Sequence, residues 1–306
     1  MSLASPTMRG SWSLGGDGNM AVIAVLGLAG LAVAVSGFGL GLSSFAVNMI
    51  GQLAAFAVLA LALDLIWGYL GILSLGHGLF FAIGGYGIAM YLLKYSYAVT
   101  GKVPDFMLFM GWKTLPFYWA GFEWFPYALA VCLALTFVVA FITGYVSFRS
   151  RVGGVYFAII TQALVYAAML LMFRNDTGFG GNNGMTGFTL VFGLPIGSRA
   201  AIAAMALLSV MCLIGALIGC RFLVRSRYGR LMVAARDDEV RLQSLGYNTL
   251  ALKVGVWCIS GLLAAIAACF MCRRSASSIR ASCRRSCRWR LRSGSPSAAA
   301  ASWSAP

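Results

Sequence analysis

Long runs of apolar residues, each about as long as a helix that crosses a lipid bilayer, dominate the chain. A bilayer core of about 30 Å needs roughly 20 apolar residues in an α-helix. The clear runs are 20–42, 45–67, 126–147, 155–173, 200–220 and 252–272. A less regular stretch, 72–93, contains Gly76, Gly78, Gly84, Gly85 and Gly87. The pattern predicts an all-α, polytopic transmembrane bundle of about seven spans with a glycine-broken helix region.

Composition supports this assignment. Of the 306 residues, 60% are hydrophobic and only 10% are charged, too few charges to wet the surface of a soluble domain of this size. A disordered chain needs the opposite bias. The first apolar run, 20–42, is longer than the core of a cleavable signal peptide, so it is predicted to remain as the first span behind an N-terminal cytoplasmic segment, 1–19.

The distribution of basic residues predicts the orientation of the spans. Arg149 and Arg151 lie between the fourth and fifth spans, and six arginines follow the sixth span within 221–251. Alternation of seven helices places both groups on one side, together with Arg9. By the positive-inside rule that side is the cytoplasm, which predicts a multi-pass protein of the plasma (inner) membrane. The net charge of +15 is thereby explained by membrane topology, and no nucleic-acid partner is expected.

Motifs for cofactors, metals and catalysis are not found in the sequence. The eight cysteines show no CxxC or Cys/His ligand spacing, and the glycine-rich stretches contain no GxxxxGK[ST] phosphate loop. We therefore expect no cofactor, no metal site and no catalytic residue.

One acidic residue, Asp64, and the single histidine, His77, fall in or beside the spans. Both are expected at similar depth near the cytoplasmic side, where a hydrogen-bonded pair is one interpretation. The other is that Asp64 caps a helix end and His77 satisfies a backbone group in the glycine turn.

Neutral polar side chains also occur at membrane depth. Asn48 and Gln52 share a face of the second span, Gln162 lies in the fifth, and Ser74 precedes the glycines. Such groups either hold helices together or line a path for a small polar solute. With Asp64 and His77, they are the candidate residues of a substrate pathway.

Several separated motifs resemble one family of membrane proteins. The runs are LDLIWGYLGILSLGHGLFFAIGGYGIAMYL, FRSRVGGVYFAIITQALVYA and GRLMVAARDDEVRLQSLGYN. Over about residues 45–270 they resemble permease subunits of branched-chain amino acid and urea ABC importers. The urea-type permease is the closer match, on LDLIWGY, VPDFM at 103–107 and FRNDTGFGGNNGMTGF at 173–188.

The resemblance implies a transport subunit that is not itself an enzyme. Such a permease pairs with a second, related permease and two cytoplasmic ATP-binding subunits, and an extracytoplasmic solute-binding protein delivers the substrate. The region 20–272 would be the permease domain, shorter than in the family, with 221–251 as its cytoplasmic coupling loop. Residues implied at the ATPase contact are Gly229, Arg230, Ala234, Arg236, Glu239, Leu245 and Gly246.

The chain departs from the family after Met271. The tail, 273–306, contains 8 arginines, 10 serines and 7 alanines without periodicity. We interpret it as disordered or as the product of a frameshift near residue 271; the alternative is a polybasic tail that binds anionic lipid, which requires a cytoplasmic location.

The leading hypothesis is an ABC permease subunit that moves urea or a short amide inward by ATP-driven alternating access. The alternatives are a branched-chain amino acid ABC permease, an ion-coupled secondary transporter that uses Asp64, and an inactive truncated product.

Overall fold

The structure is a computed structural model that describes residues 43–101, 121–174 and 198–292 without interruption. The isolated residues that it also describes are Gly27, Leu28, Gly30, Trp119, Phe179, Met185, Leu190, Val191, Leu194 and Pro195. The description of side chains ends at Met271.

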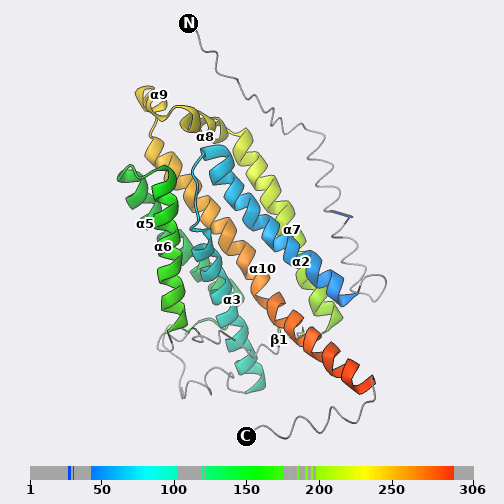
Figure 1. The fold of residues 1–306 in the computed structure, drawn as a ribbon. Helices are drawn as coiled ribbons and strands as arrows, with labels where there is room; N and C mark the ends of the chain where they lie inside the picture. Colours follow the sequence, from blue (N-terminus) through cyan, green and yellow to red (C-terminus); the bar gives the residue numbers. More distant parts are fainter. Residues whose placement is uncertain are drawn as a thin grey trace.

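The described residues form a helical bundle (Figure 1). Its long helices are α2 (Ser44–Asp64), α3 (His77–Thr100), α5 (Phe125–Arg149), α6 (Gly154–Phe173), α7 (Arg199–Arg225) and α10 (Thr249–Arg292). A π turn, η1 (Leu65–Tyr69), extends α2. The short elements are α8 (Arg227–Asp237), α9 (Glu239–Ser244) and the antiparallel pair β1 (Leu190–Val191) and β2 (Leu194–Pro195).

Six of these helices are long and apolar enough to cross a membrane. They correspond to six of the seven predicted spans, which confirms the all-α polytopic bundle. The remaining run, 20–42, lies outside the described residues apart from three of its positions. One of these, Gly30, is buried beside Val210 of α7.

Local chemistry explains where several helices begin and end. Ser43 and Ser198 are the N-caps of α2 and α7, and their hydroxyl oxygens accept the backbone N–H of Ala46 at 3.3 Å and of Ala201 at 3.2 Å. Helix α3 ends at Gly101, whose φ of 66° suits a residue without a side chain.

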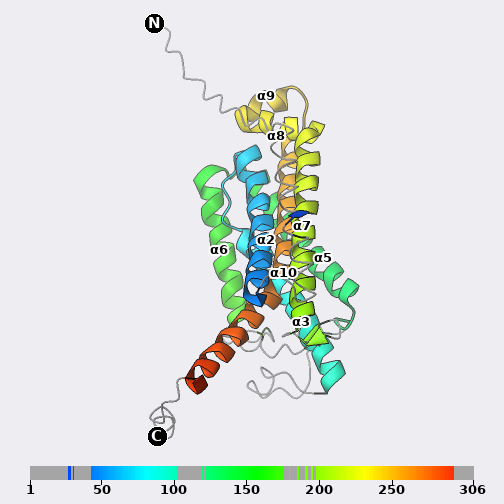
Figure 2. The same cartoon turned by 90° about the vertical axis from the view of Figure 1, so that its right-hand side faces the viewer.

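Helix α10 is the centre of the bundle. It packs against α3, α5 and α2, and α2 also lies side by side with α7 in both views (Figures 1 and 2). Helix α6 lies at the periphery and contacts mainly α3. Only 17% of its apolar membrane-spanning part is buried in the bundle. The face that it leaves uncovered suits contact with lipid.

Two short connections with basic residues lie at the same end of the bundle, as the alternation of spans predicts. The α5–α6 turn carries Arg149 and Arg151, and it lies near α8 and α9, where α7 has ended (Figure 1). We refer to this end as the α8–α9 end.

Beyond Met271, α10 continues as a helix to Arg292, and the disordered or frameshifted origin of the tail, 273–306, stays a prediction. Residues 273–292 contain no glycine or proline, and alanine and arginine favour helices. The first glycine of the tail, Gly294, comes two residues after the last helical residue, Arg292, and outside the described residues.

Candidate functional site

The glycine-rich stretch predicted at 72–93 is interrupted only before His77: residues 71–76 are non-helical, whereas Gly78, Gly84, Gly85 and Gly87 lie inside the continuous helix α3. The π turn η1 follows α2, and after Leu70 the chain is non-helical until α3 begins at His77. Gly71 has a φ of 72°, a left-handed conformation that side chains disfavour. The chain therefore turns at the α8–α9 end and runs back into the bundle before α3 begins (Figure 1).

The start of α3 lies deep in the bundle. The ring of His77 bonds to Ser260 of α10, eleven residues after the first residue of that helix, Thr249. At 1.5 Å per residue this is about 16 Å along the axis, close to half the bilayer core. The break thus places a helix N-terminus near the middle of the span.

His77, Ser74 and Ser260 form a buried polar cluster, with exposed fractions of 3%, 5% and 0%. His77 Nε2 lies 2.7 Å from Ser260 Oγ, and His77 Nδ1 lies 3.3 Å from Ser74 Oγ. The Ser260 hydroxyl donates its proton to the carbonyl of Ala62 on α2. Its oxygen is then available to accept from His77 Nε2–H.

Aromatic rings and one threonine enclose this cluster. The rings of Phe80 and Trp257 meet the His77 ring edge-on, with centroids 6.0 and 5.4 Å away. Thr161 of α6 covers the non-helical segment, and its Oγ1 accepts the backbone N–H of Leu75 at 3.4 Å. The end of the non-helical segment at Ser74 and Gly76 is therefore buried, whereas Gly71 and Leu75 are exposed.

The structure brings together two of the predicted pathway residues, Ser74 and His77, but not the others. The proposed pair of Asp64 and His77 is not formed. Asp64 comes two residues after Ala62, which turns it by about 200° around the helix axis. It is exposed, and its carboxylate lies over Gly68 instead.

The remaining pathway candidates lie elsewhere. Asn48 is buried and Gln52 half-buried near the opposite end of α2, with Asn48 about 21 Å along the axis from Ala62. Gln162 is exposed on α6, next to Thr161. The sequence did not single out Ser260 and Trp257; one serine in the apolar run WCISGLLAA gives little signal of its own.

The predicted coupling segment folds as two helices rather than one. Asp238, with a φ of −153°, separates α8 from α9, and its carboxylate accepts the backbone N–H of Arg241 at 3.0 Å as the N-cap of α9. Glu239 pairs with Lys253 of α10 at 2.6 Å. Gly246, with a φ of 85°, forms the turn into α10.

The predicted coupling residues divide into outward and inward groups. Arg230, Ala234 and Leu245 are exposed, Leu245 by 70%. Gly229 is buried against the carbonyl of Val224. Arg236 is exposed as well, and its guanidinium has two partners in this chain: Nη1 donates to the carbonyl of Gly68 at 2.8 Å, and Nε lies 3.5 Å from Oδ1 of Asp237.

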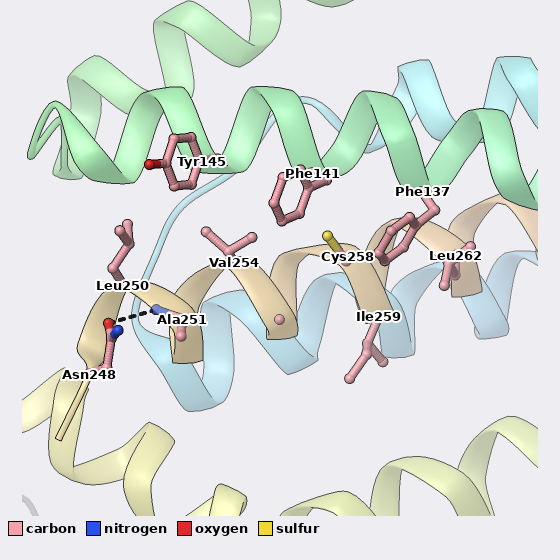
Figure 3. A pocket seen from close by; sticks show the side chains of 11 residues that line it. Phe137, Phe141, Tyr145, Asn248, Leu250, Ala251, Val254, Cys258, Ile259 and Leu262 are labelled. Carbon is pink, nitrogen blue, oxygen red and sulfur yellow. Dashed lines mark hydrogen bonds between the residues drawn. The ribbon is translucent and has the colours of Figure 1, made fainter.

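A groove of about 530 Å³ runs along the bundle surface between α5 and α10 (Figure 3). Phe137, Phe141 and Tyr145 line one wall as a ladder of stacked rings, with centroids 6.2 and 5.9 Å apart. The Asn248 side chain at one end accepts the backbone N–H of Ala251 at 3.1 Å. The groove has few hydrogen-bonding side chains that could replace the bonds of a polar solute to water. It is therefore unsuited to the passage of a polar solute.

Taken together, six apolar helices, a deep helix break and a pair of short helices at one end define a multi-pass membrane protein of the transporter class. Residues 45–281 match the family described as "Branched-chain amino acid transport system / permease component", and the chain belongs to this family. The match extends ten residues beyond Met271, where the sequence was expected to depart from the family.

Two curated relatives carry the same description, "High-affinity branched-chain amino acid transport system permease protein LivM". The proteins from Escherichia coli (strain K12) and Salmonella typhimurium (strain LT2) are each 25% identical over 234 residues, 69% of this chain. The alignment covers 48% of each relative, so the chain spans about half the length of the curated relatives it matches. No solved structure matches.

Proposed function

We propose that the chain is a membrane-spanning permease subunit of an ABC importer that moves a branched-chain amino acid inward. ATP hydrolysis on two partner subunits drives alternating access, a second permease completes the pathway, and an extracytoplasmic binding protein delivers the substrate. The observation that carries the proposal is the non-helical segment 71–76, which leads from the α8–α9 end to a helix start near mid-depth at His77, in a chain of the branched-chain amino acid permease family. Broken helices at mid-depth mark substrate sites in transporters.

The break also bears on the kind of substrate. Helix α3 begins at His77 near mid-depth, and a helix N-terminus carries partial positive charge. This favours a substrate with a carboxylate, which an amino acid has and urea lacks. The apolar surroundings of the break, Phe80 and Trp257 among them, suit an aliphatic side chain.

Urea or a short amide, the solute favoured by the sequence motifs, has less support. Both curated relatives are named for branched-chain amino acid transport. Urea transport therefore stays a prediction, to be tested beside the amino acid in one assay.

The test is uptake by proteoliposomes that contain the complex purified through this chain, with the binding protein outside and ATP inside. We expect labelled leucine to accumulate only with ATP, and unlabelled isoleucine and valine to compete. ATP-dependent uptake of urea alone would replace the amino acid with urea. Uptake without the ATP-binding subunits, or failure of the chain to assemble with any, would contradict the proposal.

An ion-coupled secondary transporter is distinguished by Asp64→Asn. If Asp64 carried a coupling ion, this variant would abolish transport. In an ABC permease we expect nearly normal uptake, because Asp64 lies on the exposed side of α2 and not in the buried cluster.

A further inference from the structure

Arg236 connects two parts of the molecule that are 168 residues apart in the sequence. Its guanidinium donates to the carbonyl oxygen of Gly68 in the π turn at 2.8 Å. Its aliphatic stem lies across Gly71, where a Cβ would come 2.5 Å from the Arg236 Cγ and 3.1 Å from the Cδ. A single side chain from α8 therefore contacts the helix break at both Gly68 and Gly71.

The contact has a physical basis in the end of the helix. The last carbonyls of a helix have no partner within it, and a cationic side chain nearby can satisfy them. Gly68 lies at this end of the extended α2, and a π turn is itself an irregularity often found at functional positions. Arg236 thus holds the conformation in which the chain leaves α2.

Helix α8 is also packed against the break. Met232 and Ala235 are 0% and 7% exposed, and they belong to the same buried cluster as Ile66 in the π turn and Leu70 directly after it. Packed interiors transmit displacement because they contain little free volume. A movement of α8 must therefore either move the π turn or break these contacts.

Beyond the break, the chain leads to the buried polar cluster. Five residues after Gly71, Gly76 packs against Thr161, and the next residue, His77, is bonded to Ser260. Helix α8 is thus connected to the first residue of α3 in two steps. Arg236 contacts Gly68 and Gly71, and the backbone from Gly71 to Gly76 leads to His77.

We propose that Arg236 is a positioning residue that transmits the movement of α8 to the helix break. The family resemblance implied that it lies at the contact with the ATP-binding subunit; its side chain is 45% exposed, and its guanidinium contacts the carbonyl of Gly68 and the carboxylate of Asp237 within this chain. This inference rests on the proposed function, because it requires a partner that moves α8.

The test compares Arg236→Gln with Arg227→Gln in the full complex. Arg227 is exposed at the start of the same helix, so its variant loses the same charge without touching the break. For Arg236→Gln we expect the amount of substrate moved per ATP hydrolysed to fall roughly tenfold, within the range of measured couplings between sites. ATP hydrolysis and assembly should stay close to those of Arg227→Gln. Arg236→Lys, which retains the stem and one donor, should recover part of the loss.

Hydrogen–deuterium exchange provides a readout that a purely structural role would not move. In the wild-type complex, peptides covering 65–76 should change their exchange between the nucleotide-free and ATP-bound states. In Arg236→Gln this change should disappear while peptides from α8 and α9 still respond. A coupling ratio equal to that of Arg227→Gln, or a retained response at 65–76, would overturn the inference. A wild-type complex without ATP-dependent transport would instead refute the proposed function.

Discussion

The approach of α3 to α10 yields a sharp prediction at Gly84. A Cβ built on this residue would lie 2.9 Å from the Cα and carbonyl carbon of Ala265 and closer still to its oxygen. These are backbone atoms of a helix, so relief requires the two helices to separate. The adjacent Gly85 is a matched control, because its Cβ would lie 4.0 Å from the Ala268 Cβ, an ordinary contact. Gly84→Ala and Gly85→Ala add the same methyl group one position apart.

The expected magnitudes follow from two opposing effects. Overpacking typically costs about 1–3 kcal/mol, and replacing glycine with alanine inside a helix recovers up to about 1 kcal/mol. Gly84→Ala should therefore lower the free energy of unfolding by about 1–2 kcal/mol, or Tm by roughly 5 °C. Gly85→Ala should leave Tm unchanged or raise it slightly.

The measurement is the size-exclusion peak of detergent-solubilised protein after heating at a series of temperatures. Equal Tm values for the two variants would show that α3 and α10 do not approach each other as closely as the structure has them. A lower Tm for Gly85→Ala than for Gly84→Ala would place the contact on the wrong face of α3.

Three further predictions concern the buried cluster and the helices at the α8–α9 end. Ser260→Ala leaves the Nε2–H of His77 buried without its acceptor, so Tm should fall by the equivalent of about 1–3 kcal/mol; an unchanged Tm in the heating assay would argue against the bond. Asp238→Ala removes the N-cap of α9 and should destabilise that helix by about 0.5–2 kcal/mol, seen as faster amide exchange in α9, whereas Asp237→Ala should not have this effect. Trp257→Ala removes a buried ring at a cost of about 3–5 kcal/mol and should abolish the monodisperse peak at temperatures where the wild type retains it; survival of that peak would show that the ring is not a core residue.

The sequence predicted the spans well because their signal is an average over many residues. Each of the six predicted spans that fall in the described residues corresponds to one helix, and Gly76 marked the non-helical segment before α3, whereas Gly78, Gly84, Gly85 and Gly87 did not interrupt that helix. The alternation of basic connections also matched the arrangement, since Arg149 and Arg151 lie at the same end of the bundle as α8 and α9.

Side-chain partners were harder to predict, because they depend on direction around a helix axis as well as on depth. Asp64 and His77 were expected at similar depth, yet Ala62 is the residue of α2 that faces the cluster. Asp64 follows it by two positions and points away. No periodicity in this apolar segment distinguishes the two faces, since both are hydrophobic.

The direction of Arg236 could not be predicted for a related reason. In the sequence it stands beside two aspartates in a charged segment that is typical of a solvated helix. Its partner is a backbone carbonyl, and every residue has one. Only the folded arrangement, in which η1 ends beside α8, identifies Gly68 as that partner.

The placement of the helix break explains why its movement requires external work. The break is held from α10 by Ser260, from α6 by Thr161 and from α8 by Arg236. A buried polar group that loses its partner costs about 1–3 kcal/mol, and at membrane depth no bulk water replaces it. Rearranging the break through thermal motion alone therefore faces this cost at the buried Ser260 bond, whereas the exposed Arg236 can exchange its bond for one with water. A movement of α8 acts through Arg236, the attachment at the bundle end. It can displace the break before the bonds to Ser260 and Thr161 separate. This arrangement suits a transporter driven from outside its own chain better than it suits a passive channel.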